Sequence, residues 1–209
     1  MTTTVSDIVP LAPADLETAI GVCARAFQRD PCLVFSVPDE GERLRLTASL
    51  FAPVLRVYHR HGGVFGFVSR GTIEGVAVCL PPGEEATDEE LGTAGLDQAL
   101  EEWGETRFAP MGSFLGAMHA VRMRVMPTPH WYCLLLAVEP AQQRQGIGGA
   151  LLRYVQARAA AARVPFYLET DVPENVGYYE GHGFSVVESW PVPALGGART
   201  WGLRWEPAE

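Results

Sequence analysis

One short segment, Gln143 to Gly149 with the sequence QRQGIGG, has the composition of an anion-binding loop. Glycines allow successive backbone N–H groups to turn toward one point. A helix that begins directly after such a loop adds the positive end of its dipole. Arg144 can add a charged donor. The segment therefore predicts a site for a phosphate or pyrophosphate group at the start of a helix.

Two known phosphate-binding motifs do not match this loop. A Walker A loop needs Gly-Lys-Ser/Thr, but Ala150 and Leu151 follow the last glycine and there is no lysine. A dinucleotide-binding G-x-G-x-x-G fingerprint fails because its last position is Leu151. A glycine-rich turn that binds no ligand stays open as an alternative.

The loop resembles the Q/R-x-x-G-x-G/A pyrophosphate loop of the GNAT acetyltransferases, in which the preceding strand ends in V-x-P, here Val138-Glu139-Pro140. A second signature of that family follows at the expected distance, in Leu168-Glu169-Thr170, Asn175, Tyr178-Tyr179-Glu180 and Gly183-Phe184. The resemblance covers residues 1–207 in element order and is strongest over 131–184. Within the family, FYLETDVPENVGYYEGHGF and PVPALGGARTWGLRW are similar in layout to puromycin N-acetyltransferases and related actinobacterial enzymes.

The resemblance implies direct transfer of an acetyl group from acetyl-CoA to an amine. It implies that the backbone of Ala137 and Val138 holds the acetyl carbonyl and the pantetheine arm, and that Asn175 also binds that arm. The residues implied to hold the pyrophosphate are Gln143, Arg144, Gln145, Gly146, Ile147, Gly148 and Gly149.

The resemblance also implies a general acid, Tyr179, near the sulfur of CoA. The chemistry agrees, because a departing thiolate whose thiol has a pKa of about 8.5 can take a proton from a phenol of pKa about 10. The alternative is that Tyr179 only packs against the sheet. Cys133 could support a covalent route, but no neighbour in sequence would activate its thiol.

The general base is less directly indicated. Family members often use a carboxylate on the central strand, yet that strand begins His130-Trp131-Tyr132-Cys133. Glu169 is the first candidate, because a carboxylate within an apolar strand needs a reason. Its alternative role is an ion pair with a basic neighbour. His130 and Glu74 are weaker candidates.

Two residues in the first third of the chain are candidates for the acceptor pocket. Asp30 precedes a loop that lines this pocket in the family and could pair with a cationic amine, although an Asp-Pro pair is often only a helix stop. Phe27 would suit an apolar or aromatic acceptor, and core packing explains it equally well. The five histidines show no zinc-binding spacing, so we expect no metal.

The elements that must position these residues follow from periodicity and turn signals. The pattern predicts strands at about 4–11, 63–69, 72–80, 130–138, 166–170, 184–190 and 198–205. It predicts helices from 13 to about 29, about 40–61, within 84–126, about 148–163 and 175–181, with a kink at Pro53 and a solvated run at 83–90. The strand at 130–138 is apolar on both faces and should be central.

The expected fold is therefore α/β: the GNAT fold, with a mixed, mostly antiparallel sheet of about seven strands and helices on both faces. A chain of 209 residues suits a single domain. Within it we expect acceptor-side helices and a hairpin at about 13–126, an acetyl-CoA-binding core at about 130–184, and C-terminal strands at about 184–205.

The formal net charge of −9 argues against nucleic acid and anionic membranes as partners, since both favour a basic face. The N-terminal sequence is not that of a signal peptide, and no apolar run could span a bilayer. We expect a cytoplasmic monomer or homodimer that acetylates a small-molecule amine. The alternatives are an acetyltransferase of proteins or peptides, and a sensor that binds acetyl-CoA without turnover.

Overall fold

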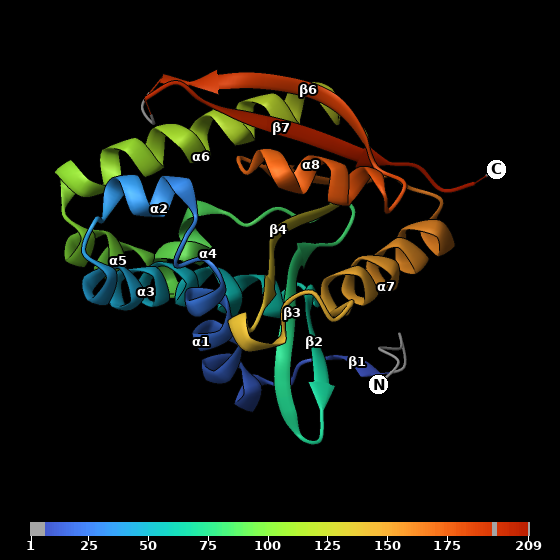
Figure 1. The fold of residues 1–209 in the computed structure, drawn as a ribbon, viewed down its shortest axis with the longest axis horizontal. Helices are drawn as coiled ribbons and strands as arrows, with labels where there is room; N and C mark the ends of the chain where they lie inside the picture. The colour runs from blue at the N-terminus through green and yellow to red at the C-terminus, as the bar shows by residue number, and fades with distance from the viewer. Residues whose placement is uncertain (1–6, 194–195, 209) are drawn as a thin grey trace.

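The computed structural model describes residues 7–193 and 196–208, which contain one seven-stranded sheet with helices on both faces (Figure 1). The strand order is β1-β2-β3-β4-β5-β7-β6, and every neighbouring pair is antiparallel except β4 and β5, which are parallel. The strands are β1 (Ile8–Pro10), β2 (Val64–Ser69), β3 (Thr72–Leu80), β4 (Trp131–Val138), β5 (Phe166–Thr170), β6 (Ser185–Val192) and β7 (Ala198–Trp205). This architecture confirms the predicted fold class.

Two apolar cores cover the two faces of the sheet. Helices α1, α2, α3, α5 and α6 pack on one face, and α7 and α8 pack on the other. The helices are α1 (Leu16–Ala26), α2 (Pro31–Ser36), α3 (Glu40–Arg60), α4 (Asp88–Thr93), α5 (Leu96–Trp103), α6 (Glu105–Val125), α7 (Ile147–Ala162) and α8 (Pro173–Glu180). Within the described residues, no helix combines the length and the apolar composition needed to cross a bilayer.

Most of the predicted elements are present. The predicted central strand is β4, the fourth of the seven strands in the sheet. The first strand was predicted at 4–11, but within the described residues it occupies only Ile8–Pro10, and residues 4–6 lie outside those residues. The run 83–90 was predicted to be a solvated surface with the least regular structure, and most of it is exposed. Its last three residues nevertheless begin α4, because Thr87 and Glu90 form a capping box.

The sequence prediction missed α2. Asp30-Pro31 ends the preceding helix, as expected, but it also starts a new one. The Asp30 side chain accepts a hydrogen bond from the backbone N–H of Leu33 at 3.0 Å, and proline is well suited to the first helical position. The consequence is that Asp30 is held by a helix at the edge of the interior.

A buried arginine fixes the segment that carries α2. Arg43 is 7% exposed, and its guanidinium donates to the carbonyls of Gln28 at 2.9 Å, Val37 at 2.7 Å and Pro38 at 2.9 Å. These carbonyls flank α2 on both sides in the chain. Arg43 therefore ties α3 to both ends of the segment that presents Asp30.

We expect Arg43→Met to lower the free energy of unfolding by about 2–4 kcal/mol, because it leaves three carbonyls without their donor. Arg45→Met is the matched control. Arg45 lies two residues away in a surface ion pair with Glu102, with side chains 60% and 38% exposed, so its removal should cost less than about 1 kcal/mol. Denaturant titration of both variants measures the difference, and equal losses would contradict the assigned role of Arg43.

Candidate active site

A gap opens in the middle of the sheet where two parallel strands separate. Pairing between β4 and β5 runs from Trp131 and Phe166 to Cys133 and Leu168 and stops there. Beyond this point β4 continues to Val138 while β5 pairs only with β7. One side of the second half of β4 therefore lacks a strand neighbour.

The register with β3 indicates which backbone groups face the gap. The N–H of Glu139 donates to the carbonyl of Glu74 at 2.8 Å, and the direction of backbone groups alternates along an antiparallel strand. Ala137 therefore turns its backbone groups toward β3, while Leu136 and Val138 turn theirs toward the gap. The carbonyl of Val138 agrees with this, since it accepts from a side chain of the following loop.

The loop after β4 has the geometry of an anion cradle. Arg144 and Gly146 adopt left-handed backbone conformations, with φ of 62° and 85°. The Gln143 side chain closes the loop by donating to the carbonyl of Val138 at 3.2 Å. The backbone N–H of Ala150 bonds to the carbonyl of Gly146, so the N–H groups of the residues between them belong to the first turn of α7, where an α-helix offers no carbonyl partners. The loop fits the predicted pyrophosphate.

The last two glycines of the loop also have a packing role. A Cβ atom at Gly148 would lie 2.8 Å from the hydroxyl of Tyr178, and one at Gly149 would overlap Nε2 of His182. The rings of Tyr178 and His182 are in contact, with centroids 4.6 Å apart and planes tilted by 40°. These glycines therefore let the segment that follows β5 lie directly against the start of α7.

Helix α8 places two predicted site residues beside the gap. It begins with Pro173 at its first position, as proline favours. Asn175 donates to the Thr170 hydroxyl at 3.4 Å, at the end of β5. Tyr179 is 8% exposed and belongs to the same core as Cys133, which is where the strands separate. Burial and the nearby Cys133 thiol raise the pKa of Tyr179 above its usual value, so the phenol keeps its proton.

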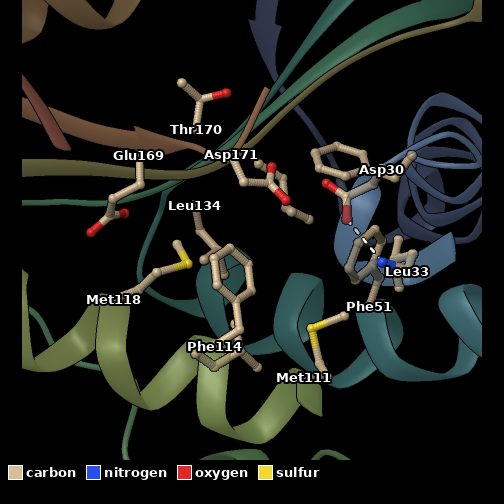
Figure 2. Close-up of a pocket in the computed structure, with 13 residues that line it drawn as sticks. Asp30, Leu33, Phe51, Met111, Phe114, Met118, Leu134, Glu169, Thr170 and Asp171 are labelled. Carbon is tan, nitrogen blue, oxygen red and sulfur yellow. Dashed lines mark hydrogen bonds between the residues drawn. The ribbon is translucent and has the colours of Figure 1, made fainter. Parts of the chain in front are cut away.

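A pocket lies between the sheet and the helices that cover the face opposite α7 and α8 (Figure 2). Its empty space is about 530 Å³ when the part that is open to solvent is counted. Its lining consists of Phe27, Asp30, Leu33, Phe51, Met111, Phe114, Leu115, Met118, Leu134, Leu135, Glu169, Thr170 and Asp171. The structure thus brings the predicted residues Phe27, Asp30 and Glu169 together. Tyr179 and the pyrophosphate loop are not part of this lining.

Glu169 is the most unusual group in this pocket. Both carboxylate oxygens are buried, and the hydroxyls of Tyr132 and Tyr167 lie near them without forming a hydrogen bond of normal geometry. Burial raises the pKa of Glu169 to about 8, against the smaller opposing effects of Tyr132, Tyr167 and Arg122. The predicted alternative, an ion pair, is not what the structure has, because Arg122 pairs with Glu85 at 3.2 Å. Glu169 is therefore a carboxyl group that can exchange a proton near neutral pH.

Sequence reasoning missed Asp171, the residue that directly follows β5. It is 8% exposed, and its Oδ2 atom is buried without a hydrogen-bond partner. Burial and the proximity of Asp171 raise the pKa of Asp30, and burial raises the pKa of Asp171. The available signal was an acidic residue directly after an apolar strand.

The weaker base candidates lie away from the pocket lining. The Nδ1 atom of His130 lies within hydrogen-bond distance, 2.8 Å, of the carbonyl oxygen of Thr128. Glu74 is on β3, and neither residue lines the pocket. Burial lowers the pKa of His130. Among residues 7–193 and 196–208, no three His, Cys, Asp or Glu side chains are grouped to hold a metal ion.

Comparison with known proteins gives one family match and several similar folds. Residues 83–186 match the family described as acetyltransferase (GNAT) domain. The chain is similar to a "histone acetyltransferase HPA2 and related acetyltransferase" from Corynebacterium glutamicum, at 21% identity and TM-score 0.67 over 100% of this chain and 98% of that chain. Arylalkylamine N-acetyltransferase 2 from Aedes aegypti is similar at 10% identity and TM-score 0.66, over 96% and 98%.

A third similar structure is ribosomal-protein-S18-alanine N-acetyltransferase from Escherichia coli, at 15% identity and TM-score 0.52, over 97% and 94%. At these identities the likeness to solved structures shows the fold. The family match goes further, because residues 83–186 contain β4, the loop, α7, β5 and α8. These elements form the gap and the anion cradle, and GNAT acetyltransferases use acetyl-CoA. The chain therefore contains an acetyltransferase domain of the GNAT family and is an acyltransferase.

Proposed function

We propose that the protein transfers an acetyl group from acetyl-CoA directly to an amine of a small molecule. The observation that carries this proposal is that the pocket adjoins the gap between β4 and β5. Leu134 and Glu169, which line the pocket, are the residues directly after the last β4–β5 pair, Cys133 and Leu168. An acceptor in the pocket can therefore reach a group held in the gap.

The chain offers suitable partners for acetyl-CoA along the gap. The first-turn N–H groups of α7, with the exposed Arg144, suit the pyrophosphate. The backbone of Val138 and Leu136 suits the acetyl carbonyl and the pantetheine arm, and the backbone direction favours Leu136 over Ala137 for this role. Asn175 suits the same arm from the other side. Bound acetyl-CoA supplies an acetyl group activated as a thioester.

Two residues of the chain can move the protons that the reaction requires. A primary amine is mostly protonated near neutral pH, and Glu169 can accept its proton, directly or through water. Its carboxylate oxygens form no hydrogen bond of normal geometry, and its pKa is about 8. Tyr179 remains protonated and can donate to the departing sulfur.

The lining of the pocket supports a small, apolar acceptor. Most of its lining is apolar, with Phe27, Phe51 and Phe114 among the walls. Similar folds occur in an arylalkylamine acetyltransferase and in a ribosomal-protein acetyltransferase, so the similarity of fold does not distinguish a small-molecule acceptor from a protein acceptor. Resemblance of the sequence to puromycin N-acetyltransferases favours a xenobiotic amine with an aromatic body. Monomer or homodimer, and a cytoplasmic location, stay predictions.

The direct test is amine-dependent release of free CoA thiol from acetyl-CoA. We expect release with apolar or aromatic primary amines, puromycin among them, and little with aminoglycosides or N-terminal peptides. Release with peptides alone would replace the small-molecule acceptor by a protein one. Tight binding of acetyl-CoA without release for any amine would favour the sensor alternative, and failure to bind acetyl-CoA would overturn the proposal.

We expect Tyr179→Phe to lower kcat about 10²- to 10⁴-fold, because the departing sulfur loses its proton donor. The dissociation constant for acetyl-CoA should change less than threefold, since the ring and its packing remain. Tyr154→Phe is the matched control, because Tyr154 accepts from Arg158 on α7 and lies outside the pocket lining. Unchanged kcat in Tyr179→Phe would leave this tyrosine with a packing role only.

We expect the kcat/KM of the wild type to rise with pH up to about 8, because Glu169 must lose its proton before it can act as a base. Glu169→Gln should lower kcat/KM at least about 10²-fold and remove this ionisation from the pH profile. A profile that keeps the same ionisation in Glu169→Gln would assign the base elsewhere.

Stability provides an independent readout for the same variant. The folded-state pKa of Glu169 lies above the ordinary 4.5, so the folded protein holds a proton that the unfolded chain releases. The free energy of unfolding should therefore fall as pH rises from about 4.5 to about 8. Glu169→Gln should weaken this fall, whereas Glu101→Gln, on the exposed side of α5, should not.

A further inference from the structure

The pocket contains a second carboxyl site that the proposed reaction does not use. Figure 2 shows the carboxyl groups of Asp30 and Asp171 turned toward each other, with Leu134 and Phe114 between this pair and Glu169. The two aspartates come from distant parts of the chain, the start of α2 and the end of β5. Their meeting is a product of the tertiary fold.

Local structure accounts for only part of this pair. One oxygen of Asp30 caps α2 through the N–H of Leu33 at 3.0 Å. The Oδ2 atom of Asp171, by contrast, is buried without any partner, in a residue that is 92% buried (8% exposed). In the ion pairs of residues 7–193 and 196–208, neither aspartate takes part.

Two facing carboxyl groups, the buried Asp171 and the half-buried Asp30, are stabilised by a shared proton or by a cation. Burial raises the pKa of both groups, and for Asp30 the neighbouring Asp171 adds to the effect, which outweighs the N–H groups of Leu33 and Cys32. An ammonium group would supply both charge and hydrogen-bond donors, and the pocket gives it access. The chemistry of the pair is therefore that of a site for a protonated amine.

We propose that Asp30 and Asp171 bind a second, protonated amino group of the acceptor, so that the enzyme acts on diamines with an apolar body. This inference rests on the proposed function, in which the other amino group meets Glu169. Glu169 lies in β5 and Asp171 directly follows the end of that strand, so their Cα atoms are at most about 7 Å apart. The aromatic walls, Phe51 and Phe114, suit a ring or alkyl chain that spans this spacing.

The test compares 1,4-bis(aminomethyl)benzene with 4-methylbenzylamine, which has the same ring and lacks the second amino group. In the wild type, the diamine should have a kcat/KM at least tenfold higher, mainly through a lower KM. Asp171→Asn and Asp30→Asn should remove this preference by lowering the kcat/KM of the diamine to that of the monoamine. Both variants keep the side-chain size, and asparagine can still cap α2. Glu101→Gln should keep the full preference.

A binding measurement separates this inference from the proposed function. Calorimetric titration of the two amines, without acetyl-CoA, should give a tenfold lower Kd for the diamine in the wild type and equal values in Asp171→Asn. A preference in Kd without thiol release for any amine would refute the acetyltransfer proposal and support the diamine site. Thiol release with equal kcat/KM for both amines, or a preference that persists in both aspartate variants, would overturn the diamine site.

Discussion

The separation of β4 from β5 after Cys133 and Leu168 is the constraint on which the rest of the site depends. A strand in a sheet normally has its backbone groups paired on both sides, and half of β4 has them paired on one side only. The unpaired side needs a ligand or water, and it faces the loop, α8 and the pocket. One interruption of strand pairing therefore provides both a binding edge and a connection between the two faces of the sheet.

The two faces of the sheet make opposite electrostatic contributions. The cradle at the start of α7 presents N–H groups and Arg144 to an anion. The pocket presents three carboxyl groups, among apolar walls, to a cation. Buried charges that lack partners destabilise a fold unless something binds them, and perturbed groups of this kind gather at functional sites. The acidic pocket thus suits the proposed amine, as the cradle suits the proposed pyrophosphate.

The parts of the molecule fixed by local signals could be predicted from the sequence. β4 could be predicted because it is apolar on both faces. The loop after β4 could be predicted because its glycines precede a segment with a clear helical pattern. Helix α2 could not be read, because Asp30-Pro31 is a stop signal and a start signal at once. Asp171 was missed for a different reason: its role depends on its proximity to Asp30, which is produced by tertiary packing.

Tyr178 and His182 pack on Gly148 and Gly149, so the glycines of such a loop do not by themselves indicate a bound ligand. Two independent steric reasons favour glycine at these positions: the approach of an anion, and the approach of the segment that contains Tyr178 and His182. A descendant that lost the proposed general acid, or even its nucleotide, would still have Tyr178 and His182 packed against these glycines. The glycine motif therefore indicates that the fold has been inherited. Only groups that the fold does not need for packing indicate that the chemistry has been retained.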